Sequence, residues 1–442
     1  MIKNNKIIIG SGLAGPLLAI YLGEKKYNVT LYEKRKDLRK NTISVGRSIN
    51  LALSHRGIKA LKGANVFDQI EPLLIPMKGR MIHLLDGQNQ FQPYSNNTND
   101  CINSISRGAL NNILMNKAES YEQIKILFNH SLSKIDEDKN ELIFTNGNKV
   151  PLSSHVFGAD GFGSKIRKYI DSNVTNSSLL EPLGHVYKEL NIPSCKDGNF
   201  QLDPNALHIW PREDFMLIAL PNTNHSFTCT LFISQKGINS IESLSSPSLV
   251  VDFFDQYFND ILPLIDNFPN SFFDNPTGNL ATVYSDHWQY NNQFCLIGDS
   301  AHAIVPFFGQ GMNASFEDCE IFSCCLDKNQ NKWDNLFEEY ESLHKADGYA
   351  IAKMALENYI EMRDLVLRKD FINKKQLSNI LWEKFPERFI PRYNMVSFTS
   401  IPYSEVYRRG QIQDTIIEEI NPENPDMQLA EKLILEKLKP II

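Results

Sequence analysis

The sequence predicts an α/β fold in which a Rossmann-like domain contains an inserted sheet-rich domain and is followed by a C-terminal helical region. Residues 6–33 read as strand, glycine turn, helix and strand, which is the order of a βαβ unit with parallel strands. Residues 180–290 change to longer strands, and an inserted second domain explains this change most simply. After Trp333 apolar residues recur at helical spacing, so we expect the chain to end in helices.

The composition is that of a folded, acidic protein. Of its 442 residues, 42% are hydrophobic and 22% are charged, which excludes disorder for the bulk of the chain. Lys and Arg number 45 against 52 Asp and Glu, so the formal net charge is −7. This balance excludes a general electrostatic attraction to nucleic acid or to an anionic membrane. Any anionic ligand must therefore be held by a local group of residues.

The cysteines and the apolar segments predict a cytoplasmic chain without a membrane anchor. The seven cysteines contain no C-x-x-C pair and form neither a zinc pattern nor a disulfide framework, so a reducing compartment is the simplest location. The charge-free stretch from Ile7 to Gly23 imitates a signal peptide, but glycines and Pro16 interrupt it and it runs into Glu24. No other run reaches the roughly 18 apolar residues that a membrane helix needs.

The first half of the chain alternates short strands and helices. Strands are expected at 6–9 and 29–33, with a helix ending at Leu22 between them. The further signals are short strands around an Asp-Gly turn, a helical stretch, an Asn-Gly hairpin and a strand before a glycine-rich turn. In chain order they lie at 78–94, 107–120, 141–151 and 155–160.

The second half begins with the sheet-rich segment and ends in helices. Strands are expected at 208–210, 215–220, 226–233 and 294–297, and helices at 250–258 and 313–326. These patterns set the predicted domain boundaries. Residues 1–180 with 291–330 form the Rossmann-like domain, residues 181–290 the sheet-rich domain and residues 331–442 the helical region.

The glycine turn of the first βαβ unit carries the first chemical signal. Gly10, Gly12 and Gly15 match G-x-G-x-x-G after an apolar strand and before a helix, and Glu33 ends the next strand 18 residues after Gly15. Such glycines allow a tight turn and a close backbone approach, the helix N-terminus holds a pyrophosphate, and the acidic residue binds ribose hydroxyls. The pattern predicts dinucleotide binding and leaves flavin and nicotinamide as alternatives.

Two further motifs follow predicted strands. Gly298 and Asp299 end a strand at the edge where open α/β sheets bind ligands, and the segment 306–313 opens a helix whose positive end suits an anion such as a reduced flavin. Asp160 and Gly161 also follow a strand and suit a phosphate or ribose contact. Taken alone, the first pair fits a strand end with a helix cap better than a ligand site, and the alternative for the second is an ordinary Asp-Gly turn.

In chain order, the motifs at 10–15, 160–161 and 298–299 together resemble those of the single-component, FAD-dependent aromatic hydroxylases. Longer runs resemble the kynurenine 3-monooxygenases among them, from about residue 5 to 405. Eukaryotic members end in an apolar membrane anchor, whereas this chain ends in a charged helix, so the resemblance implies a soluble, bacterial-type member. The runs that carry it are Gly46–Gly57, His208–Arg212, Ser226–Phe232, His302–Asn313 and Asn358–Arg363.

The resemblance implies an enzyme that hydroxylates L-kynurenine to 3-hydroxy-L-kynurenine within tryptophan degradation by the kynurenine pathway. FAD would be the cofactor, NADPH and O2 the co-substrates, and a flavin C4a-hydroperoxide the oxygen donor. The flavin would carry the chemistry without an obligatory catalytic acid or base, since the aniline nitrogen already donates electron density to the reacting carbon. The first domain would then bind FAD and the second the substrate.

The resemblance also assigns individual residues. Four polar residues would bind the amino-acid part of kynurenine, with a guanidinium suited to the α-carboxylate: Arg80, Tyr94, Asn358 and Tyr393. Apolar residues would surround the ring: Leu207, Met216, Ile218, Leu220 and Phe232. Pro306, Phe307 and Gln310 would lie between ring and flavin. FAD would contact Gly10, Gly12, Ala14, Gly15, Glu33, Arg35, Ala52, Arg107, Leu132, Asp160, Gly161, Gly298, Asp299, Gly311, Met312 and Asn313.

Several alternatives remain open at this point. A different flavin hydroxylase or a halogenase would keep the FAD motifs and change the pocket, and a non-catalytic redox sensor would bind FAD without turnover. A metal site is not expected, because His302 has no partner ligands at suitable spacing and a helix face or cap explains Glu317 and Asp318. The sequence has no second G-x-G-x-x-G in strand context, so it does not locate NADPH. A homodimer is also left open.

Overall fold

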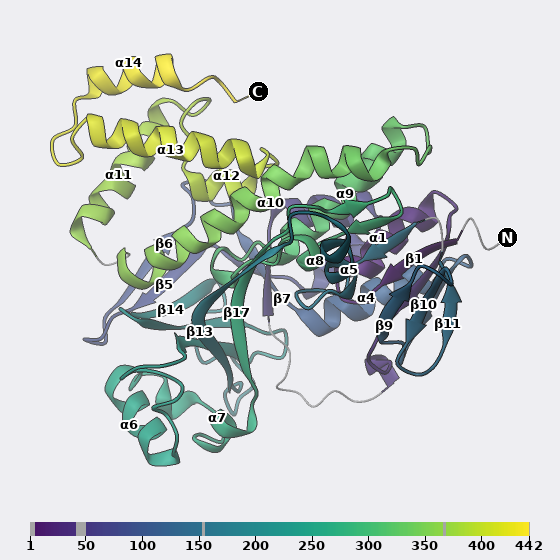
Figure 1. Ribbon diagram of the computed structural model, residues 1–442. Helices are drawn as coiled ribbons and strands as arrows, with labels where there is room; N and C mark the ends of the chain where they lie inside the picture. Colours follow the sequence, from purple (N-terminus) through teal and green to yellow (C-terminus); the bar gives the residue numbers. More distant parts are fainter. Residues whose placement is uncertain (1–4, 41–49, 153–154, 366–367, 442) are drawn as a thin grey trace.

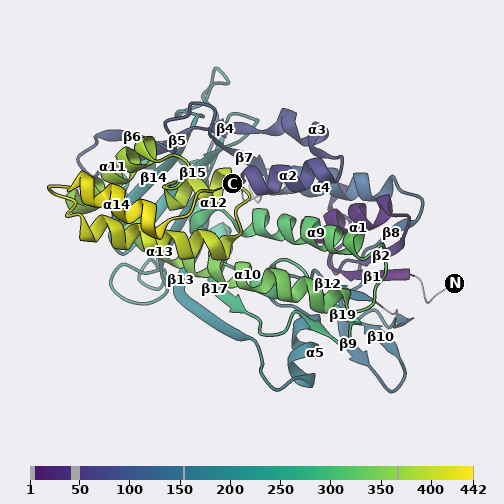
Figure 2. The same cartoon turned by 90° about the horizontal axis from the view of Figure 1, so that it is seen from above.

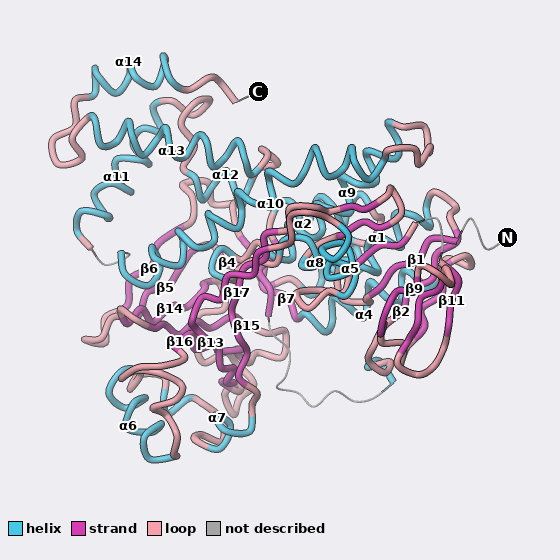
Figure 3. Tube along the Cα trace, viewed as in Figure 1, coloured by secondary structure: helices cyan, strands magenta, loops and turns pink. Residues whose placement is uncertain are grey.

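The computed structural model describes residues 5–40, 50–152, 155–365 and 368–441. The run Gly46–Gly57 therefore begins outside the described residues. Figure 1 shows three regions: the N-terminal α/β region, a large sheet with helices α6 and α7 beneath it, and the C-terminal helices above. Figure 3 shows how strands dominate the middle region and helices the C-terminal one.

The N-terminal region is built on a six-stranded sheet of order β18-β19-β12-β1-β2-β8. β1 pairs in parallel with β2 and β12, and β2 with β8 and β12 with β19, so the predicted parallel sheet is confirmed; only β18 runs antiparallel to its neighbour. The bounds are β1 Asn5–Ile9, β2 Asn28–Tyr32, β8 Ile124–Leu127, β12 Val156–Gly158, β18 Gln289–Tyr290 and β19 Phe294–Leu296.

Helix α1 (Ala14–Glu24) explains the charge-free stretch that imitates a signal peptide. Every residue from Gly15 to Gly23 is buried, so the helix needs no polar face and lies inside the core. Its neighbours are α4 (Arg107–Glu119) and α9 (Gly311–Lys328), which the sequence predicts within a few residues. The other helices of this region are α2 His55–Gly63, α3 Phe67–Ile70, α5 Lys165–Asn173 and α8 Asp299–His302.

Two small sheets flank the main one. The predicted Asn-Gly hairpin is confirmed, with Gly147 at φ +86° between β10 and β11. The strands of the two small sheets are β9 Leu132–Asp136, β10 Glu141–Phe144 and β11 Lys149–Pro151, and β3 Asn50–Leu53, β7 Ile102–Ser106 and β4 Ile75–Met77.

The middle region is a seven-stranded sheet of order β17-β13-β16-β15-β14-β5-β6. From the sequence, residues 78–94 are assigned to the first domain. In the structure β5 pairs in parallel with β14, so the hairpin β5–β6 extends the large sheet of the middle region. The strand bounds are β5 Gly79–His83, β6 Asn89–Pro93, β13 Leu179–Ile192, β14 Ala206–Arg212, β15 Phe215–Pro221, β16 Phe227–Ser234 and β17 Thr277–Tyr284.

The two faces of the large sheet have different neighbours. On β15, Phe215, Leu217 and Ala219 pack in one apolar cluster with α6 (Pro247–Tyr257) and α7 (Asn270–Asp274). Met216 and its alternating neighbour Ile218 face the other way, toward the C-terminal helices. The alternation of a half-buried strand thus separates a structural face from a face that is available to a site.

The C-terminal region is helical, as predicted, and α10 joins it to the rest. α10 passes along both the N-terminal region and the large sheet, and α13 packs on it (Figures 1 and 2). The bounds are α10 Leu336–Ile360, continued by a π-helical turn Glu361–Leu365, then α11 Lys369–Lys384, α12 Arg392–Phe398, α13 Tyr403–Glu419 and α14 Met427–Lys437. Within the described residues, no helix combines the length and the apolar character needed to cross a membrane.

Candidate active site

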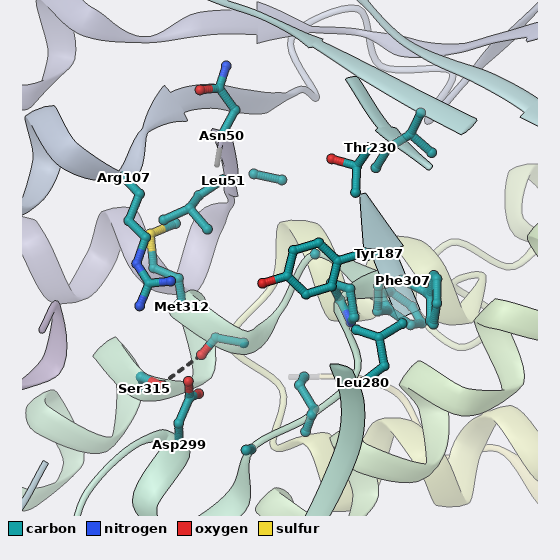
Figure 4. A pocket seen from close by; sticks show the side chains of 18 of the residues that line it. Asn50, Leu51, Arg107, Tyr187, Thr230, Leu280, Asp299, Phe307, Met312 and Ser315 are labelled. Atoms are coloured by element: carbon teal, nitrogen blue, oxygen red, sulfur yellow. Dashed lines mark hydrogen bonds between the residues drawn. The ribbon is translucent and has the colours of Figure 1, made fainter. Parts of the chain in front are cut away.

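A cavity of about 440 Å³ lies between the glycine-rich edge of the six-stranded sheet and the upper face of the large sheet. Its size is typical of a small-molecule site. In Figure 4, Arg107 and Met312 reach into it from one side, Tyr187 and Phe307 from the other, and Asp299 from below. One continuous space therefore joins the three glycine motifs to the substrate face of the large sheet.

The glycine loop is shaped by contacts within the protein and is open toward the cavity. Gly10 has φ +105°, and a Cβ there would lie 2.2 Å from the carbonyl oxygen of Ala159. A Cβ on Gly15 would lie 2.0 Å from the carbonyl oxygen of Gly10, so both positions require glycine. A Cβ on Gly12 would meet no atom within 4 Å, and Gly12 and Ala14 line the cavity.

This loop fits the pyrophosphate of a dinucleotide. The N-terminus of α1 has no side-chain cap, so its first backbone N–H groups lack that partner. The hydroxyl of Ser11, between Gly10 and Gly12, is buried and has no hydrogen-bond partner among the described residues. Phosphate oxygens would satisfy both kinds of donor.

Glu33 ends β2 as predicted and is held in place. Its carboxylate accepts hydrogen bonds from the backbone N–H of Ser11 at 2.8 Å and from Arg35 Nε at 2.7 Å. Burial alone would raise the pKa of Glu33, but these bonds outweigh burial and lower it. The residue stays an acceptor beside the glycine loop. Glu33, Arg35 and Leu132 lie outside the cavity, where the backbone of residues 129–130 bonds that of Glu33 and Arg35.

The turn at Gly298 brings the second motif to the cavity. Gly298 has φ +68°, and Asp299 faces the cavity interior, where the surrounding protein raises the pKa of its carboxyl by desolvation. Gly311 and Met312 of the first turn of α9 also line the cavity, together with Ala52 of β3. The positive end of an 18-residue helix therefore meets the space where the glycine motifs converge.

Asn313 and Asp160, two further residues predicted to contact FAD, do not line the cavity. Asn313 is fully buried, accepts from the backbone N–H of Ser54 at 2.9 Å and donates to the carbonyl oxygen of Ala52 at 2.8 Å. Asp160 accepts from Ser164 and from the backbone N–H of Lys165, so its carboxylate caps α5. Gly161 itself lines the cavity.

Arg80 marks the opposite end of the cavity. It is 4% exposed, and its guanidinium carbon lies 4.9 Å from the ring centre of Tyr393. Its Nη1 is 3.4 Å from the Oε1 atom of Glu361, while its Nε has no hydrogen-bond partner among the described residues. Tyr94 stacks on Tyr393 with ring centres 5.0 Å apart, although only Arg80 and Tyr393 line the cavity. A buried guanidinium with a free donor suits a carboxylate ligand.

The predicted apolar wall lies together on the cavity surface. It consists of Leu207, Met216, Ile218, Leu220 and Phe232, and Pro306 and Phe307, predicted to lie between ring and flavin, line the cavity with it. Asn358 and Gln310 stand behind it: Asn358 donates to the carbonyl oxygen of Phe307 at 2.8 Å, and Gln310 accepts from the Tyr403 hydroxyl at 3.0 Å. These two polar residues therefore support the residues that line the cavity and do not line it themselves.

Some cavity residues were given no individual role from the sequence. Tyr187 of β13, Leu280 of β17 and Met362 of the π-helical turn all line the cavity. Thr228 and Thr230 also do, and these could have been found, since they alternate with Phe232 on one face of β16. Tyr187 could not, because β13 itself is not predicted.

Comparisons with known proteins agree with this geometry. The family description "FAD binding domain" matches residues 4–334. A kynurenine 3-monooxygenase of Myxococcus xanthus is 40% identical and covers 100% of this chain and 97% of its own. A kynurenine 3-monooxygenase of Cytophaga hutchinsonii is 43% identical, covering 97% and 96%. The chain belongs to the kynurenine 3-monooxygenase family. A solved 2-methyl-3-hydroxypyridine-5-carboxylic acid oxygenase shares the fold, with a TM-score of 0.67, 18% identity and 82% and 94% coverage.

As a member of the kynurenine 3-monooxygenase family, the chain is an FAD-dependent enzyme.

The Gly298 turn is held in place by Asp318 of α9. The backbone N–H of Gly298 donates to Asp318 Oδ2 at 2.6 Å, and the same oxygen is 2.8 Å from His302 Nε2. His344 Nε2 is 2.9 Å from Asp318 Oδ1. The expectation that a helix face or cap explains Glu317 and Asp318 is wrong, because both carboxylates are buried among cations.

Substitution of Gly12 separates cofactor binding from folding. We expect Gly12→Ala to leave the thermal midpoint of the FAD-free protein within a few degrees and to raise the dissociation constant for FAD at least about tenfold, since its methyl group fills the space that a pyrophosphate needs. FAD fluorescence titration measures the affinity. Gly163→Ala, whose Cβ also meets open space, is the matched control. Equal FAD affinity in both variants would contradict the assignment of the loop.

The buried His344 gives a pH-dependent prediction for the kynurenine 3-monooxygenase fold. Burial lowers the pKa of His344, but Asp318 and Asp347 outweigh burial and raise it to about 10. The folded-state pKa lies above the unfolded value near 6.5, so this stabilisation is complete below pH 6.5 and is lost as pH rises through 10. His344→Gln should lower the free energy of unfolding by about 3–5 kcal/mol at pH 6 and by progressively less toward pH 10.

Urea denaturation of both proteins at several pH values measures this difference. His130→Gln, outside the buried cluster, is the control. A difference between wild type and His344→Gln that stays constant from pH 6 to 10 would show that no buried imidazolium stabilises the fold.

Proposed function

We propose that this chain hydroxylates the ring of L-kynurenine at the carbon next to the aniline nitrogen. NADPH and O2 are consumed, and 3-hydroxy-L-kynurenine, NADP⁺ and water are formed. The observation that carries the proposal is the single cavity that joins the glycine loop of an FAD-binding family to the buried Arg80. Proteins named kynurenine 3-monooxygenase match the chain over its full length, which supports the same substrate.

Arg80 is proposed to bind the α-carboxylate of the substrate. The guanidinium is buried against the Tyr393 ring, which restricts its rotamers before substrate arrives. Its unpaired Nε gives the carboxylate a donor that no described residue uses. Tyr94 stacks on Tyr393 and supports its ring from behind. The amino-acid part of kynurenine would thus be fixed at one end of the cavity and its ring aimed at the other.

The apolar wall is proposed to place the ring and exclude water. Met216 and Phe232 come from paired positions of neighbouring strands, and Phe307 packs on Phe232 with ring centres 4.9 Å apart. FAD, when bound, supplies the redox chemistry that activates O2 for insertion of one oxygen atom. Gly311 and Met312 would lie beside the flavin ring, at the positive end of α9, which favours the negative charge of the reduced state.

We also propose a cytoplasmic location for the enzyme. The seven cysteines are all free thiols, which supports a reducing compartment and hence a cytoplasmic enzyme. The predicted domain boundaries also stay a proposal, with the hairpin β5–β6 joined to the sheet of the second domain. A homodimer stays an open alternative.

The test is NADPH consumption by the purified, FAD-loaded chain with and without L-kynurenine, combined with mass spectrometry of the product. We expect consumption to rise with kynurenine and a product one oxygen atom heavier. Bound FAD with a response to a phenol or an indole, and none to kynurenine, would replace the substrate by that of another hydroxylase. Bound FAD with no stimulated turnover would indicate a redox sensor.

Arg80 should control substrate affinity more than the chemical step. We expect Arg80→Ala to raise the KM for L-kynurenine about 10- to 100-fold, because a charge-assisted hydrogen bond to the carboxylate is lost, and to change kcat much less. Arg80→Lys keeps the charge without the fork and should be intermediate. Steady-state kinetics at saturating NADPH measure both constants, with the exposed Arg408→Ala as control. An unchanged KM in Arg80→Ala would contradict the carboxylate role.

A further inference from the structure

A first line of buried polar contacts runs from the flavin-side turn to the C-terminal helices. The backbone N–H of Gly298 donates to Asp318 Oδ2 at 2.6 Å, and Asp318 Oδ1 lies 2.9 Å from His344 Nε2. His344 Nδ1 is 3.4 Å from Asp347 Oδ2. Asp347 Oδ1 accepts from the backbone N–H of Ser404, at the start of α13, at 2.7 Å. These three side chains and two backbone groups come from four segments, the Gly298 turn, α9, α10 and α13, and form one connected line.

A second line of buried contacts runs beside the first and reaches α13 at Tyr403, the residue before Ser404. Arg56 Nη1 donates to Glu317 Oε1 at 2.6 Å, and the Arg56 guanidinium lies 3.9 Å from the ring centre of Tyr403. The Tyr403 hydroxyl donates to Gln310 Oε1 at 3.0 Å, and Gln310 is 3.4 Å from Ser54 Oγ. Arg56, Tyr403, Gln310 and Ser54 are each at most 1% exposed.

The two lines pass through neighbours on α9, Asp318 and Glu317, and reach α13 at neighbours, Ser404 and Tyr403. We infer that this acid pair couples FAD binding to the docking of α12 and α13, with Asp318 as the positioning residue. Gly298 begins the turn that carries Asp299 into the cavity, so FAD that orders this turn favours the geometry of Asp318 and, through it, of residues 403–404. Coupling is reciprocal, so docked helices favour FAD binding equally.

The coupling has a consequence for substrate. Tyr393 lies on α12 and closes the carboxylate end of the cavity over Arg80. α12 packs on α13, and Arg56 also donates from Nε to the carbonyl oxygen of Val396 on α12 at 3.3 Å. Loading with FAD therefore helps to complete the kynurenine site, which gives an order of binding with FAD first. The inference rests on FAD binding by this family and not on the identity of the substrate.

The test is amide hydrogen exchange of the full chain with and without FAD, together with FAD titration. In the wild type, FAD should slow exchange at residues 10–15 and, at least about fivefold, at residues 392–404. In Asp318→Asn, the slowing at 10–15 should persist, the slowing at 392–404 should fall below about twofold, and the FAD dissociation constant should rise about tenfold. Glu320→Gln removes a carboxylate of the same helix that pairs with Lys59 near the surface, and should behave as wild type.

The outcomes separate coupling from general stability. No slowing at 392–404 in the wild type, or equal slowing in Asp318→Asn, would overturn the inference. If Asp318→Asn does not fold, the double variant Tyr403→Leu with Asp347→Ala removes the ring that lies against Arg56 and the carboxylate that accepts from Ser404, and it is held to the same criteria. A chain that shows the coupling and ignores kynurenine would keep this inference and overturn the proposed substrate, whereas a chain that does not bind FAD would overturn both.

Discussion

The buried carboxylate of Asp318 is the constraint on which the arrangement of the site depends. It is fully buried, and such a charge is costly unless cations and hydrogen-bond donors surround it. The fold supplies the backbone N–H of Gly298, His302 and His344, which come from the turn after β19, from α8 and from α10. Burial would raise the pKa of Asp318, but the histidines hold it well below its usual range. Satisfying one charge therefore fixes three segments relative to α9.

A second constraint acts at the sheet edge. Gly10 and Gly15 are fixed by the approach of backbone to backbone, which draws the loop after β1 against the loop after β12. The same edge receives α9 through the Gly298 turn. Since the large sheet turns the alternating face of β15 toward this edge, cofactor loop and substrate wall share a single cavity. The cavity is thus a consequence of the strand order and of the close backbone packing at Gly10 and Gly15.

Local sequence patterns predicted many of the helices and strands, and failed where contacts between distant residues determine the structure. The βαβ unit, α4, α9 and the strands β14 to β16 were predictable from spacing alone. β13 was not predictable in this way. One of its buried positions is Lys188, whose ammonium donates to the carbonyl oxygen of Asn275, so the strand lacks the regular alternation of apolar and polar residues. The membership of β5 in the large sheet depends on its pairing with β14, more than a hundred residues away. For the site, the resemblance identified residues near the cavity but could not show which of them line it: Asn313, Gln310 and Asn358 lie behind the residues that do.

Local charge explains how an acidic chain can hold the carboxylate of its proposed zwitterionic substrate. The net charge is −7, yet the carboxylate end of the cavity holds Arg80 close enough to Lys375 of α11 to influence it. Burial, reinforced by Arg80, lowers the pKa of Lys375 to about 8, as expected where positive charge already accumulates. Glu361, 3.4 Å from Arg80, offsets part of this positive charge, so a substrate carboxylate would share the Arg80 guanidinium with it. The opposite end, around Met216, Phe232 and Phe307, is apolar, so charge fixes one end of the substrate while shape alone places the ring. That division fixes the orientation of the ring relative to the cofactor side of the cavity.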